Sequence, residues 1–169
     1  MVMSVKRLTA VVSGRQKHAR GFTMTELMTV VFIVGTMLAL AGPAFKSFIG
    51  EQRLRATSAD LRIAMLTARS ESVKRNRNVT ITPISSNWSN GWTIANPVST
   101  LPDILNNVID NPSIVVALDS GSTVSFRANG RPVETVDFEI SVGSGTYFTQ
   151  KCLKLGAGGL LSDAVGACT

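Results

Sequence analysis

The sequence predicts an α+β fold, in which one long N-terminal helix packs on a small antiparallel β-sheet or sandwich. Residues 27–45 contain no charged residue, and the helical pattern continues beyond them to about residue 74. After Asn76, short runs rich in β-branched and aromatic residues alternate with turns that contain glycine and asparagine. These changes divide the chain into four segments, namely residues 1–21, 22–50, 51–76 and 77–169.

Residues 1–21 form a basic leader. The leader holds five basic residues and no acidic one, whereas the other 12 basic and 11 acidic residues of the chain nearly cancel. The only histidine, His18, also lies in the leader, so a chain that begins after it has no imidazole for a catalytic pair or a zinc site. The sequence therefore predicts no enzyme, no catalytic residue, no metal site and no cofactor.

Residues 22–50 are predicted to form a transmembrane helix. The uncharged run 27–45 would span about 28 Å as a helix, close to the roughly 30 Å hydrocarbon core of a bilayer. The basic residues before it predict a cytoplasmic N-terminus and an exported C-terminal part. A cleaved secretory signal is the alternative, with Ala39-Leu40-Ala41 as its cleavage site.

Residues 51–76 are predicted to continue the same helix as an amphipathic segment. Gly42-Pro43 is interpreted as a kink or local break rather than as the end of the helix. An ordinary signal peptide has no reason to share a helix with the domain that it delivers. The apolar face is predicted to comprise Leu54, Leu61, Ala64, Met65, Ala68 and Val73.

Residues 77–169 are predicted to form the β domain. Trp88 and Trp92 are interpreted as core residues of this domain rather than as a platform for an aromatic ligand. The polar run 101–112 lacks the ligand spacing of an EF-hand and is interpreted as a surface loop. Six runs have the composition of strands, namely residues 79–82, 91–94, 114–118, 123–126, 136–140 and 152–155.

Cys152 and Cys168 are the only cysteines. They are either two unrelated buried thiols or a disulfide that closes the C-terminal tail. Export of the β domain would place them in an oxidising compartment and favours the disulfide. Closing such a loop contributes about 3 kcal/mol in the chain-entropy account.

The stretch RGFTMTE, from Arg20 to Glu26, resembles the prepilin signal of type IV pilins and type II secretion pseudopilins. The resemblance implies that prepilin peptidase cleaves between Gly21 and Phe22 and methylates the new Phe22 amine. Glu26 is then the fifth mature residue. In the family, this glutamate is thought to pair with the N-terminal amine of a neighbouring subunit and so to set the register during filament assembly. A lone carboxylate in a membrane otherwise needs such a partner. Met24 and Thr25 depart from the usual pattern.

The exported part resembles the GspH/FimT/FimU group of minor pilins and pseudopilins. The resemblance rests on Ala68-Arg69-Ser70-Glu71-Ser72, on Gly91-Trp92, and on Phe126 with Gly130-Arg131. It covers residues 21–132 and is weaker beyond them, although a C-terminal cysteine pair is seen in FimU-like members. FimU-like minor pilins are therefore favoured within the group.

Nucleic acid is a weaker candidate partner. Basic residues near the end of the helix could contact DNA if they shared one exposed face, although cations there also complement the helix dipole. DNA-binding FimT-like pilins have a Gly-Arg-x-Arg motif in the tail, and the corresponding residues 155–161 contain no arginine. The candidate residues are Arg69, Lys74, Arg75, Arg77 and Arg131.

The resemblance implies a structural protein of the type IV pilus, placed at or near the filament tip. Its expected partners are prepilin peptidase, other minor pilins, the major pilin and, before assembly, lipids of the inner membrane. It would first lie in the inner membrane with a periplasmic β domain and then in the pilus. The alternatives are a type II secretion pseudopilin of the GspH kind and a DNA-binding FimT-like pilin for DNA uptake.

Overall fold

The computed structural model describes residues 21–96, 98, 100–143, 145 and 148–168, without the side chains of residues 40–44. The predicted leader therefore lies outside the described residues, apart from Gly21. The described part of the chain divides into two compact units, with the boundary between Leu40 and Ala41. The β domain and the part of α1 that packs on it belong to the second unit.

Helix α1 runs from Met24 to Arg75. The helix continues through Gly42-Pro43, which confirms that these residues do not end it. The predicted kink at this place stays a prediction. No helix in the described part of the chain combines enough length with enough hydropathy to cross a membrane.

The C-terminal part of α1 packs on the β domain through one stripe of side chains. Leu54, Leu61, Ala64, Met65 and Ala68 are buried, as predicted. Val73 is 54% exposed, so its predicted place in the core was wrong. The buried stripe instead continues from Ala68 to Ser72, and each helical residue turns the side chain by about 100°, which carries Val73 off the stripe.

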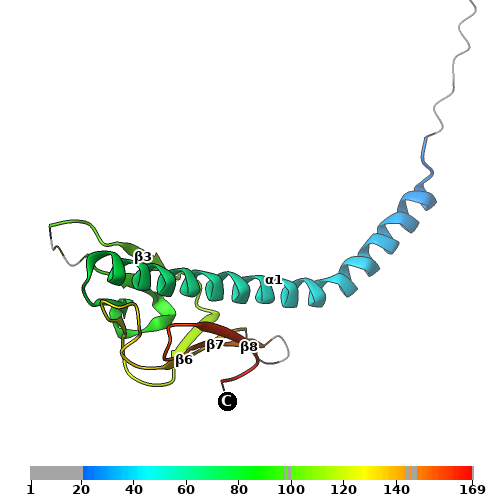
Figure 1. Ribbon diagram of the computed structural model, residues 1–169. Helices are drawn as coiled ribbons and strands as arrows, with labels where there is room; N and C mark the ends of the chain where they lie inside the picture. Colours follow the sequence, from blue (N-terminus) through cyan, green and yellow to red (C-terminus); the bar gives the residue numbers. More distant parts are fainter. Residues whose placement is uncertain (1–20, 97, 99, 144, 146–147, 169) are drawn as a thin grey trace, which may run out of the picture. The chain divides into compact units, whose positions relative to one another are not determined.

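The β domain contains two antiparallel four-stranded sheets. The first sheet has the strand order β3-β2-β1-β5 and the second has the order β4-β6-β7-β8. Figure 1 shows β6, β7 and β8 running beneath the C-terminal part of α1. The strand bounds are β1 Val79–Pro83, β2 Gly91–Ile94, β3 Leu105–Val108, β4 Ile114–Leu118, β5 Val124–Phe126, β6 Val136–Val142, β7 Thr149–Leu155 and β8 Leu161–Val165.

All six predicted strands are present, and the structure adds two at sheet edges. The run 101–112 was predicted to be a surface loop, but β3 lies within it and pairs with β2 from Gly91↔Val108 to Ile94↔Leu105. No strand was predicted in the tail after Leu155, which was expected to be closed by a disulfide. This tail contains β8, which pairs with β7. Neither β3 nor β8 contains a fully buried residue, so neither segment shows the apolar alternation that identifies a half-buried strand.

The core lies between α1 and the inner faces of both sheets. The strand residues alternate between buried and less buried positions along β6, as antiparallel strands with one covered face do. Two short 3-10 helices, Ile84–Ser86 and Trp88–Asn90, connect β1 to β2. The largest fully buried side chains are Trp92, Phe126, Phe138, Leu61 and Met65.

Both tryptophans belong to this core, which confirms the packing interpretation. Trp92 is fully buried and Trp88 is 6% exposed. The Trp88 ring meets Phe138 edge to face, with 4.8 Å between ring centroids. Such aromatic pairs contribute about 0.5–1.5 kcal/mol beyond the area that they bury. Neither indole N–H has a hydrogen-bond partner among the described residues.

Candidate functional site

The predicted processing site lies immediately before α1. Gly21, Phe22 and Thr23 have no regular secondary structure, and the Phe22 side chain is 79% exposed. A peptidase that cuts between Gly21 and Phe22 therefore meets an exposed segment that is not helical. The cleavage and the methylation themselves stay predictions.

Glu26 lies in the first turn of α1, where a negative charge complements the helix dipole. Its backbone N–H donates a hydrogen bond to the Thr23 hydroxyl at 3.2 Å. Thr23 and Glu26 therefore have the spacing and one of the two hydrogen bonds of a capping box. The sequence reasoning missed this signal, although Thr-x-x-Glu before an apolar run is readable. Among the described residues, the exposed Glu26 carboxylate has no ion-pair partner.

Arg69 does not lie on an open surface. Its guanidinium Nη1 donates to the carbonyl oxygen of Gly159 at 2.8 Å, across 90 residues of sequence. A side chain at Gly159 would stand 3.2 Å from the Arg69 guanidinium, and one at Gly130 would stand 2.8 Å from the Val73 methyl. Both glycines have φ +75, which favours glycine. Arg69 therefore holds the turn of residues 156–160 against the end of α1, and the turn of residues 127–131 packs closely beside it through Gly130.

Glu71 organises the next turn of the helix. Its carboxylate accepts a hydrogen bond from Arg75 at 2.6 Å and lies 3.5 Å from the Lys74 ammonium. Arg75 also donates to the side-chain oxygen of Asn96 at 2.9 Å. The Arg75 hydrogen bond, together with the charges of Lys74 and Arg75, holds the pKa of Glu71 below its ordinary value despite partial desolvation. The predicted DNA candidates Arg69 and Arg75 are thus committed to contacts within the chain.

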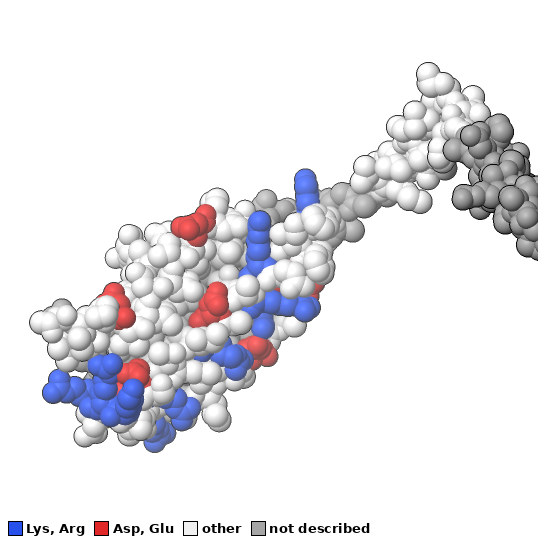
Figure 2. Space-filling view, turned by 90° about the horizontal axis from the view of Figure 1, so that it is seen from above, with Lys and Arg blue, Asp and Glu red and all other residues white. Residues whose placement is uncertain are grey.

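The other predicted DNA candidates lie at this end of the β domain, together with Arg127. Lys74, Arg77, Arg127 and Arg131 are exposed, and we call them the basic cap. The turn that carries Arg127 and Arg131 is closed by two hydrogen bonds and lies against α1 through Gly130. Figure 2 shows the corresponding group of basic side chains at one end of the molecule. Sequence reasoning missed Arg127, because only the folded turn brings it beside the helix end.

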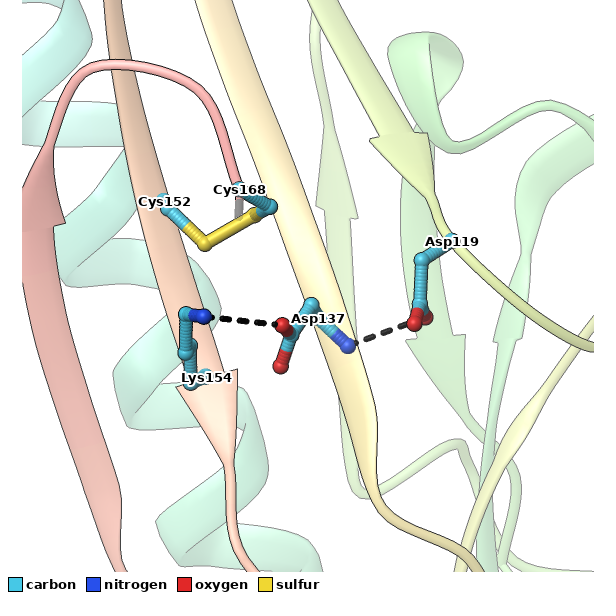
Figure 3. The surroundings of a disulfide bond; sticks show 5 residues. All are labelled: Asp119, Asp137, Cys152, Lys154 and Cys168. Carbon is cyan, nitrogen blue, oxygen red and sulfur yellow. Dashed lines mark hydrogen bonds and ion pairs between the residues drawn. A yellow bond between two sulfur atoms is a disulfide. The ribbon is translucent and has the colours of Figure 1, made fainter.

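The C-terminal tail is closed by a disulfide. Cys152 of β7 is bonded to Cys168, with 5.1 Å between their Cα atoms. Figure 3 shows Asp137 of β6 beside this bond, with its carboxylate 3.4 Å from the Lys154 ammonium and its backbone N–H donating to Asp119. The disulfide reading of the two cysteines is confirmed. Since both thiols are used in the bond, they offer no thiolate beside Asp137 for a metal.

Asp163 connects strand β8 to α1 and to β7 through two ion pairs. Asp163 accepts hydrogen bonds from Arg62 of α1 and from Lys151 of β7, the latter at 2.7 Å. Burial raises the pKa of the Asp163 carboxyl, but the hydrogen bonds and charges of Lys151 and Arg62 outweigh it, so the pKa lies below its ordinary value. The edge strand is thereby connected to both the helix and its neighbouring strand.

Two family descriptions match the chain. The prokaryotic N-terminal methylation motif matches residues 16–42, which include Gly21, Phe22 and Glu26. The family described as type II transport protein GspH matches residues 57–159. No curated protein matches the chain.

Solved structures of one protein resemble the fold. The type IV minor pilin FimU of Pseudomonas aeruginosa PAO1, in space group P21, is 20% identical with a TM-score of 0.57, covering 68% of this chain and 90% of that one. The same protein in space group P65 is 21% identical with a TM-score of 0.54, covering 66% and 92%. These structures confirm the α+β fold. Because the GspH match spans more than half of the 169 residues, the chain belongs to the GspH family of type II transport proteins.

Proposed function

We propose that this chain is a FimU-like minor pilin that takes part in type IV pilus assembly at or near the filament tip. It is first held in the inner membrane, with a cytoplasmic N-terminus and a periplasmic β domain, and then enters the pilus. The proposal is supported by the methylation motif over residues 16–42 and by the FimU-like fold. The observation that carries it is the exposed Glu26, unpaired within the described residues, four positions after the exposed Phe22.

The proposed role of Glu26 follows from charge pairing. Cleavage after Gly21 creates an ammonium at Phe22, and methylation keeps its positive charge. Within an assembling filament, the Glu26 carboxylate of one subunit and the Phe22 ammonium of the next would neutralise one another in an apolar environment. An ion pair of this kind fixes the axial register of neighbouring helices, because either charge alone is costly there.

The first test separates the charge of Glu26 from its place in the helix cap. Glu26→Gln retains the backbone N–H that bonds Thr23 but removes the charge, whereas Thr23→Ala removes the cap and keeps the charge. We expect Glu26→Gln to lower incorporation into sheared filaments by about tenfold or more, the effect of roughly 1.4 kcal/mol of lost pairing. The measurement is the filament-to-membrane ratio on immunoblots.

Thr23→Ala is the matched control and is expected to incorporate almost normally. N-terminal sequencing should find a methylated Phe22 in all variants, so that a processing defect is distinguished from an assembly defect. Normal incorporation of Glu26→Gln would contradict the proposed role of the charge. A defect in Thr23→Ala alone would show that helix capping is what assembly requires.

A second candidate is a minor pseudopilin of a type II secretion system. The description of the matched family favours it, since that family is named for type II transport. The same processing and the same Glu26 pairing would serve either filament. Crosslinking of the chain in cells, followed by identification of the attached subunits, distinguishes the pilus from the secretion system.

The third candidate, DNA binding, rests on the basic cap. The four residues of the cap are exposed, although Lys74 also lies 3.5 Å from Glu71 and Arg131 donates to the Ala157 carbonyl oxygen at 3.4 Å. We therefore expect weak binding without sequence preference that is lost by about 200 mM salt. Fluorescence anisotropy of labelled duplex DNA with the full chain in detergent measures this. Arg77→Gln with Arg127→Gln should reduce the low-salt affinity, and binding that persists at 200 mM salt would contradict the expectation.

A further inference from the structure

A groove lies between α1 and one end of the second sheet. Lys46, Gly50 and Arg53 of α1 line one wall, and Ser113, Val142 and Gly143 line the other. Its volume is about 370 Å³. All these residues belong to the unit of residues 41–169, so the groove is a feature of one compact body. It lies at the opposite end of the amphipathic helix from the basic cap.

The groove is positively charged. Lys46 and Arg53 are seven residues apart, two helical turns, and therefore lie on one side of α1. Neither side chain forms a hydrogen bond or ion pair with another residue that the structure describes, in contrast to Arg62, Arg69 and Arg75. No carboxylate is among the lining residues. Two unneutralised cations over a concave surface favour an anionic ligand.

The shape of the groove leaves room for such a ligand. Gly50 stands between the two cations on the helix wall, and a Cβ placed there would meet no atom within 4 Å. The opposite wall is a turn in which the Gly143 N–H is bonded to the Ser113 carbonyl. A compact anion can therefore approach both cations without displacing a side chain.

The surroundings favour a lipid over a soluble anion. Phe45 is 64% exposed and Phe48 is 56% exposed, on either side of Lys46 in the sequence. The uncharged run 27–45 ends immediately before Lys46. Phenylalanine beside lysine and arginine is the composition of segments that lie in a membrane interface, where the ring enters the acyl boundary and the cation reaches the phosphates.

We infer that the groove binds the phosphate of an anionic phospholipid headgroup in the outer leaflet of the inner membrane. Lys46 and Arg53 hold the phosphate, and Phe45 and Phe48 contact the acyl region. This inference rests on the proposed function, because it requires the chain to be held in the inner membrane before assembly. It adds a site that keeps the β domain close to the bilayer until the subunit enters a filament.

Native mass spectrometry of the full chain in detergent micelles tests the inference. The probes are phosphatidylglycerol, phosphatidylcholine and inorganic phosphate. We expect phosphatidylglycerol to bind preferentially and Lys46→Gln with Arg53→Gln to weaken it roughly thirtyfold, the combined effect of two basic residues at an anionic surface. Lys74→Gln with Arg77→Gln removes the same charge from the other end of the helix and should leave the affinity within about twofold.

Gly50→Leu provides a variant with unchanged charge. The leucine side chain fills the groove and is expected to weaken phosphatidylglycerol binding. If the lipid were held by apolar contact alone, the added leucine would instead strengthen its binding. Equal affinities of the groove variants and the wild-type chain would overturn the inference. Preferential binding of inorganic phosphate would identify a soluble anion instead. If the groove variants bind lipid normally but fail to enter the filament, the groove contacts a neighbouring subunit and not a lipid.

The two proposals fail separately. Lipid binding is measured without filaments, and Glu26→Gln is expected to leave it unchanged. If Glu26→Gln assembles normally while the groove variants lose phosphatidylglycerol binding, the proposed role of Glu26 is wrong and the lipid site is supported. If the groove variants and the wild-type chain bind phosphatidylglycerol equally while Glu26→Gln fails to assemble, the lipid site is wrong and the proposed role of Glu26 is supported.

Discussion

Replacing Gly91 by alanine is expected to cost about 3 kcal/mol or more of the free energy of unfolding. Gly91 begins β2 with a φ of +110, a backbone conformation that side chains rarely adopt. A Cβ at this position would stand 2.1 Å from the Asn107 carbonyl oxygen and 3.0 Å from the Val108 Cα. Both atoms belong to the backbone of β3, so the clash cannot be relieved by rotating a side chain. Either β2 and β3 separate, or the turn after Trp88 changes.

The measurement is thermal unfolding of the full chain in detergent, followed by tryptophan fluorescence. Trp92 follows Gly91 and is fully buried, so its emission reports on this part of the core. A loss of this size corresponds to a decrease of about 10 °C in Tm. Gly158→Ala is the control, since a Cβ at Gly158 would meet nothing within 4 Å. A Gly91→Ala variant as stable as this control would contradict the steric account of the Gly-Trp pair.

The main elements could be predicted because their signals are local. A buried helix face repeats every three or four residues, and β6 alternates strictly, so both patterns are visible without knowledge of the partner. Strands β3 and β8 gave no such signal. The side chains of Asn106 and of Ser162 to Val165 are exposed, and these strands are specified by hydrogen bonds to a neighbour rather than by burial.

The functional residues also divide into those with a local sequence signal and those that only the fold brings together. The signal around Gly21, Phe22 and Glu26 is contiguous in sequence, and so is the Thr23 cap that the sequence reasoning overlooked. The contact of Arg69 with Gly159 joins residues 90 positions apart, and no local pattern distinguishes this arginine from a surface cation. The fold consequently removed Arg69 and Arg75 from the candidate DNA surface and added Arg127 to its remaining members.

Loss of the disulfide is expected to be the second large effect on stability. The bond joins Cys152 to a residue 16 positions away and encloses the glycine-rich turn and all of β8. Its removal should lower the free energy of unfolding by about 3 kcal/mol, because the unfolded tail gains conformational freedom. Cys168→Ser is the preferred variant. Cys168 is half-buried, whereas a polar replacement of the fully buried Cys152 would add a separate penalty in the core.

Chemical reduction supplies the internal control for that variant. Dithiothreitol should lower the Tm of the wild-type chain to that of Cys168→Ser and leave the variant unchanged. Hydrogen exchange should increase first in β8, because β7 retains its pairing with β6, whereas β8 is an edge strand that pairs with β7 alone among the described strands. An unchanged Tm after complete reduction would mean that the Asp163 ion pairs and the β7 pairing alone hold the tail.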